Sequence, residues 1–158
     1  MCRLDEEACL RCFKMIKEVF NYGALPTLAR VVQFTEKRQQ VIAHNIANIN
    51  TPRYVAKDLD VSAFQKSLRG AIDRRRGSVD PVNGALHHQD SRNVEFHKQG
   101  LNVKPVELNR NVLFHDRGNR NLERQMQDMV ENVMVHTAAL RMLKSRMDTL
   151  GQAVRLRV

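Results

Sequence analysis

Apolar side chains recur at alternating spacings of three and four residues in two long stretches, which is the pattern of helices that each pack along one face. The first stretch predicts an N-terminal axial helix over residues 24–50, with Pro26 tolerated because the N–H groups of a first helical turn have no intrahelical partner. A heptad-like repeat of this kind favours coiled-coil-like packing. Its stripe has two polar members near the middle and consists of Leu25, Leu28, Val32, Thr35, Gln39, Ile42, Ile46 and Ile49.

The second stretch has the longest unbroken pattern and predicts a C-terminal axial helix over residues 119–158. Asn121 suits the N-cap, Glu123 the positive end of the helix dipole, and Arg155 the negative end. Such a helix would be about 50 Å long at 1.5 Å per residue, so its stripe needs an equally long partner. The stripe consists of Leu122, Met126, Met129, Val133, His136, Leu140, Leu143, Met147, Leu150 and Val154.

The first helix is expected to end at or just before Thr51. Pro52 has no backbone N–H and disfavours the α conformation of the residue before it. The Asn-rich residues before it suit a helix end, because Asn tolerates the left-handed conformation.

Residues 51–118 lose the helical period and become rich in Gly, Pro, Asn, His and Arg, so we expect an irregular middle segment that is partly β or disordered. About two turns of helix are expected over 60–68, followed by an exposed loop or linker over 70–84. Residues 1–23 are expected to form an N-terminal extension and lead-in. Short strands are expected at Val94–Phe96, Leu101–Val106 and Val112–Phe114.

The predicted fold class is therefore mainly α, with long antiparallel N- and C-terminal helices around an irregular middle. Two helices cannot bury both stripes fully, so we infer that other copies or other proteins complete the core. The low aromatic content of 5%, with no Trp, also disfavours a large globular core.

The net charge of +9 fits an acidic partner such as nucleic acid or an anionic membrane surface, and fits equally a solvated basic surface. A basic nucleic-acid-binding coiled coil is the rival hypothesis. The cluster of Arg69, Arg74, Arg75 and Arg76 lacks interleaved aromatic residues, so a solvated loop is the preferred interpretation.

Chemical sites are not indicated by the sequence. Cys9 and Cys12 have the spacing of half a zinc site or a redox pair, but the other half of a zinc site is missing, and an incidental pair is preferred. The His residues of the middle segment lack ligand spacing, and no catalytic constellation is present. We expect no enzyme activity, no cofactor and no metal.

No apolar run is long enough to span a bilayer. The first seven residues carry acids where a cleaved signal peptide needs bases, and no apolar core follows them. We therefore expect no membrane span and no cleaved signal peptide.

The stretch from Gln39 to Tyr54 resembles the N-terminal signature of bacterial flagellar rod and hook proteins, in which a helix ends in an Asn-rich turn before Pro. The stretch Gly118–Met126 is similar to the entry of the C-terminal helix in a proximal rod member of that family. The resemblance covers residues 15–68 and 112–158, whereas residues 69–111 are not matched. It implies that residues 1–14 are an upstream extension or a misassigned start.

This chain departs from the family pattern at three positions. Arg53 stands where the family has Gly, so a type II turn with φ > 0 is disfavoured and a type I turn with Pro52 in its second position is expected. His44 stands where Asn is usual, and His136 where an aromatic such as Tyr is common. The turn motif comprises Asn50, Thr51, Pro52, Arg53 and Tyr54.

The resemblance implies a structural component of the proximal rod of the flagellar basal body, assembling through its terminal helices around the export channel. It implies export by the flagellar type III apparatus and, as partners, other copies of the chain, the rod protein FlgC and the export-gate junction protein FliE. Another rod or hook paralogue is the second alternative. The expected assembly interface comprises Leu28, Val32, Ile42, Asn45, Ile46, Asn48, Ile49, Leu122, Met126, Met129, Val133, His136, Leu140, Leu143, Met147 and Leu150.

Overall fold

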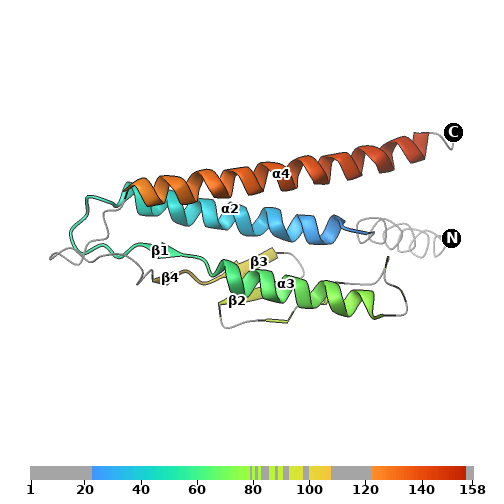
Figure 1. Cartoon of the computed structure of the whole chain (residues 1–158), viewed down its shortest axis with the longest axis horizontal. Coiled ribbons are helices and arrows are strands. Elements are labelled where there is room, and N and C mark those ends of the chain that lie inside the picture. The colour runs from blue at the N-terminus through green and yellow to red at the C-terminus, as the bar shows by residue number, and fades with distance from the viewer. Residues whose placement is uncertain are drawn as a thin grey trace, which may run out of the picture.

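The structure is a computed structural model that describes residues 23–78, 80, 82, 86–87, 89–90, 93–97, 100–107 and 122–155. Its elements are Leu25–Ala47 (α2), Lys57–Asp58 (β1), Val61–Arg76 (α3), Val94–His97 (β2), Gly100–Val103 (β3), Val106–Glu107 (β4) and Leu122–Arg155 (α4). Helix α4 lies along one side of α2, while α3 and the strands lie along the other (Figure 1). The mainly α fold class is therefore confirmed, and α2 is the middle layer.

Helices α2 and α4 run antiparallel, as the two apolar stripes predicted, and α4 continues past the start of α2 (Figure 1). Helix α2 ends at Ala47, three residues before the end of the predicted segment. The Asn48 N–H still donates to the His44 carbonyl at 3.2 Å, but the Thr51 N–H then donates to the Asn48 carbonyl at 2.9 Å in a turn. The helix therefore ends a few residues before Pro52. Proline disfavours the α conformation of the residue before it, which favours this early end.

Helix α3 extends well beyond the predicted residues 60–68. It begins after Asp60, whose Oδ1 accepts a hydrogen bond from the Ala63 N–H at 2.9 Å. This N-cap lowers the pKa of the Asp60 carboxyl, because the backbone hydrogen bond favours its charged form. The expectation of an exposed loop from Gly70 was wrong as far as Arg76, because α3 continues to that residue. The basic side chains of its last turn suit the negative end of the helix dipole and so favour the longer helix.

Two short antiparallel strand pairs occupy the described part of the middle segment. Strand β2 pairs with β3, with Val94 opposite Val103, and β1 pairs with β4. The strand predicted at 94–96 is confirmed. The one predicted over 101–106 is instead divided between β3 and β4 at Pro105, which has no N–H for a ladder. The third predicted strand, at 112–114, lies outside the described residues.

The apolar core lies between α2, α3 and the strands, on the side of α2 away from α4. Phe34 of α2 stacks on Phe64 of α3, with ring centroids 4.1 Å apart and ring planes at 7°. Phe34 lies off the predicted apolar stripe, so α2 is apolar on two sides rather than one. The buried cluster comprises Phe34, Leu59, Phe64, Leu68, Val94 and Leu101.

Candidate assembly interface

The contact between α2 and α4 is polar at its centre. Asn132 of α4 is 2% exposed, and its amide donates to the Thr35 carbonyl at 2.9 Å and to Gln39 Oε1 at 2.8 Å. Thr35 Oγ1 lies 2.8 Å from His136 Nδ1 and also donates to carbonyl oxygens of the preceding helical turn. When the Thr35 hydroxyl donates to a carbonyl, the tautomer of His136 with a proton on Nδ1 donates to Thr35 Oγ1. A shifted register would leave these buried groups unpaired, so the polar layer fixes how α4 lies on α2.

A second polar contact surrounds Asn45 near the end of α2. Its Nδ2 donates to the Lys57 carbonyl at 2.5 Å and to Gln125 Oε1 of α4 at 3.4 Å. Its Oδ1 accepts from the Lys57 N–H at 3.1 Å and from the Tyr54 hydroxyl at 2.9 Å. Burial raises the pKa of the Tyr54 phenol. Asn45 thereby joins α2, α4 and the returning chain at one point.

A charged cluster joins the three layers at Arg38. Its guanidinium donates two hydrogen bonds to the Asp58 carboxylate, at 3.1 Å each. Burial acts to lower the pKa of Arg38, but the Asp58 hydrogen bond and the charges of Asp58, Asp128 and Glu131 outweigh it and raise that pKa. Burial raises the pKa of the Asp128 carboxyl on α4, and Arg38 opposes the rise. The fork-shaped pair holds β1 against α2.

The predicted interface residues fall into three groups in the described chain. Ile42 and Asn45 are buried within the subunit. Four are exposed on α4, namely Leu122, Met126, Val133 and Leu140. The others are half-buried, namely Leu28, Val32, Ile46, Asn48, Ile49, Met129, His136, Leu143, Met147 and Leu150. Their contact with other subunits stays a prediction.

The line of α4 that faces α2 differs from the predicted stripe. Its three buried residues are Gln125, Asn132 and Ala139, spaced seven apart. The sequence reasoning missed this line because two of its members are polar and the third is small. The sequence does contain a signal for this line, because Gln125, Asn132 and Ala139 repeat at the heptad spacing of a helix–helix contact. Much of the apolar surface of α4 is consequently turned outward, including Val130 and Met134.

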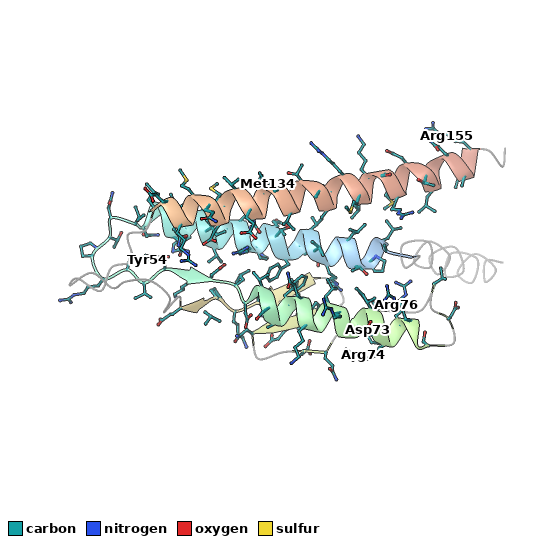
Figure 2. The ribbon with its side chains drawn as sticks, viewed as in Figure 1. Tyr54, Asp73, Arg74, Arg76, Met134 and Arg155 are labelled. Atoms are coloured by element: carbon teal, nitrogen blue, oxygen red, sulfur yellow. The ribbon has the colours of Figure 1, made fainter. Side chains whose placement is uncertain are left out.

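The turn after α2 contradicts the expected backbone conformation. Arg53 has φ of 62°, whereas the third residue of a type I turn has negative φ. The Tyr54 N–H donates to the Thr51 carbonyl at 3.3 Å, which closes the turn around Pro52 and Arg53. The chain thus keeps the left-handed position even though a non-glycine residue occupies it. Thr51, Pro52 and Arg53 are exposed, and the turn lies at one end of the molecule, near Tyr54 (Figure 2).

The arginine cluster is helical rather than a loop, and one of its members is buried. Arg75 is 7% exposed and donates to the Gly23 carbonyl at 2.7 Å and to the Val82 carbonyl. It thereby connects the end of α3 to the start of α2. Arg74 and Arg76 are exposed near the end of α3, close to Asp73 (Figure 2). The expectation of a wholly solvated cluster was wrong for Arg75.

The described surface includes a groove and a wider hollow. A groove of about 340 Å³ lies between α2 and α4 and is lined by Glu36, Gln39, Gln40, Ala43, Asn132, Val133 and His136. A wider hollow of about 750 Å³ lies along α3 beside Gln89 and Asp90.

Among the described residues, no group of three or more His, Cys, Asp or Glu side chains is placed to hold a metal ion. The Cys9 and Cys12 pair lies outside that part of the chain. None of the described helices is both long and apolar enough to cross a membrane.

Residues 33–54 of the chain match the family model described as flagella basal body rod protein. The chain is 29% identical over 112 residues to the flagellar basal body rod protein FlgB of Borrelia hermsii, which covers 68% of this chain and 78% of that protein. It is 22% identical to FlgB of Bacillus subtilis, over 81% of this chain and 90% of the relative. FlgB of Aquifex aeolicus is 24% identical, over 80% of this chain and 88% of the relative. The chain is thus similar to flagellar basal body rod proteins over most of its length.

The segment matched by the rod protein family model contains the second half of α2 and the turn after it. It therefore includes Thr35, Gln39 and Asn45, three residues of α2 that make polar contacts with α4, and ends at Tyr54. The segment that matches the rod protein family model is thus the segment that positions α4.

Proposed function

We propose that the chain is a structural subunit of the proximal rod of the flagellar basal body. The observation that supports this most is an antiparallel helical hairpin whose α4 leaves a long apolar surface exposed, in a chain that matches rod proteins over most of its length. A rod subunit needs such a surface, because its neighbours in the shaft cover it. The role is mechanical: the helices carry torque and surround the export channel.

The partners belong to the same proposal. Other copies of the chain, the rod protein FlgC and the export-gate junction protein FliE would contact the terminal helices, and the flagellar type III apparatus would export the chain without a cleaved signal peptide. In the rod, the subunit would lie within the periplasmic part of the basal body. The rival nucleic-acid hypothesis loses support, because Arg75 of its basic cluster is committed to backbone carbonyls inside the subunit.

Deletion of the gene, followed by imaging of isolated basal bodies, tests the function. We expect basal bodies without a rod and cells without motility, both restored by the wild-type chain supplied in trans. Complementation by Arg76→Glu is the control for surface charge, because Arg76 is exposed and belongs to α3, which lies on the other side of α2 from α4 (Figure 1). Intact rods in the deletion strain would refute the assignment.

A further inference from the structure

One exposed face of α2 carries a stripe with a distinct chemical order. Its members are spaced by four, three and four residues, so they lie on one side of the helix. All four are exposed, and three of them line the groove between α2 and α4. We call this set the α2 stripe: Glu36, Gln40, Ala43 and Ala47.

The outer face of α4 carries a ridge with the same spacing. Val130 and Met134 are 54% and 66% exposed, and Met134 lies near the middle of the helix (Figure 2). Thr137 is half-buried and Arg141 is exposed. We call this set the α4 ridge: Val130, Met134, Thr137 and Arg141.

The two sets are complementary position by position when the ridge is read forward and the stripe backward. Val130 and Met134 then meet the small side chains of Ala47 and Ala43. Thr137 meets Gln40, and the guanidinium of Arg141 meets the carboxylate of Glu36. The apolar and charged ends lie about three turns apart in both sets, about 16.5 Å at 1.5 Å per residue.

We propose that the α4 ridge of one copy packs into the α2 stripe and groove of a second copy of this chain. Helix α2 runs antiparallel to α4 within a subunit, so a stripe read backward means that the two copies point the same way. If the copies pointed in opposite directions and Met134 still met Ala43, Arg141 would meet Asn50, which has no carboxylate. The contact uses two different surfaces, so it repeats from copy to copy instead of closing as a twofold dimer.

This inference rests on the proposed function, which supplies the need for copies that all point along one shaft. It goes further because it names the contacting residues and their pairing. The groove is lined by the carboxylate of Glu36 and by no Lys or Arg, which suits a ridge that ends in Arg141.

Charge reversal tests the pairing in purified full-length chain. Arg141→Glu and Glu36→Arg are each expected to weaken self-association at least about tenfold, because like charges then face each other. The combined variant restores opposite charges, and its self-association is expected to return to within about twofold of wild type.

Arg146→Glu, which changes the net charge by the same amount as Arg141→Glu, is exposed on a different face of α4 and is the matched control. Sedimentation velocity measures association, and circular dichroism checks that each variant folds. A combined variant as weak as the single ones would overturn the pairing.

Cysteine cross-linking tests the direction. On a background with Cys2, Cys9 and Cys12 changed to Ser, a chain with both Ala43→Cys and Met134→Cys is expected to form a ladder of linked oligomers, and neither single variant should form one. Absence of the ladder, or a linked dimer from Met134→Cys alone, would overturn the proposal, the latter because it shows a symmetric contact.

Basal-body imaging separates this inference from the proposed function. If the pairing holds in the purified chain but the protein is absent from the rod, the inference stands and the function fails. Rods that assemble normally from Glu36→Arg alone would refute the inference and leave the rod function intact.

Discussion

Arg53 adopts a left-handed backbone conformation that costs an L residue roughly 1–2 kcal/mol. Glycine avoids this cost, but it lowers the free energy of unfolding by roughly 0.5–1 kcal/mol because it gives the unfolded chain more conformational freedom. We therefore expect Arg53→Gly to raise the free energy of unfolding by about 0.5–1 kcal/mol, measured by urea denaturation. Arg53→Ala is the control, since it removes the charge and keeps the strained Cβ. An equal gain from both variants would show that charge, and not backbone strain, is the cause.

The sequence predicted the position of this turn but not its shape. Pro52 placed the helix end within a few residues, because its missing N–H acts locally. The conformation of Arg53 depends instead on the Asn45 and Tyr54 contacts that direct the chain back along α2. Arg75 gives the same lesson: nothing local distinguishes it from Arg74 and Arg76, and only the meeting of α3 with Gly23 and Val82 buries it.

Helix α3 depends on its cap, which makes its stability dependent on pH. The Asp60 carboxyl has a lowered pKa in the folded chain, so its contribution is present above the unfolded pKa of about 3.9 and is lost as pH falls through the lower folded value. Asp60→Ala is expected to lower the free energy of unfolding by about 1 kcal/mol at pH 7. The difference in the free energy of unfolding between wild type and Asp60→Ala should become smaller as the pH falls from 5 to 3.

Denaturant titrations at several pH values measure this gap. Asp60→Asn keeps an acceptor oxygen without a charge, so it should retain most of the cap at every pH. A gap for Asp60→Ala that stays constant between pH 5 and pH 3 would contradict the charged-cap explanation.

The long helices were readable from the sequence, because helix existence and type follow from periodic side chains. Which face of α4 meets α2 was not readable. The apolar stripe marked the expected seam, but Asn132 pairs with Thr35 and Gln39 and so makes a polar line the buried one. Hydrogen-bond pairing between helices leaves no hydrophobic period, so the sequence could predict the hairpin and not its rotation.

The three layers are held by different forces. An apolar cluster around Phe34 and Phe64 joins α2 to α3 and the strands, whereas the centre of the contact between α2 and α4 is polar. The register set by Asn132 and Thr35 also leaves the last part of α4 beyond the start of α2 (Figure 1). Neither layer could be assigned from composition, which does not show that Phe34, Phe64 and Phe96 gather on one side of α2.

This division predicts an uneven pattern of hydrogen exchange. In the isolated subunit, amides of α3 and of α2 around Phe34 should exchange most slowly, because their opening exposes the apolar core. Amides of α4 after Leu143 should exchange fastest among the described helices, since few contacts within the described chain cover them. Exchange measured by mass spectrometry before and after assembly should show the largest gain of protection in α4, which packing against neighbouring copies would bury. If α4 after Leu143 were already as protected as α3 in the isolated subunit, the outward surface of α4 would not be the one completed by assembly.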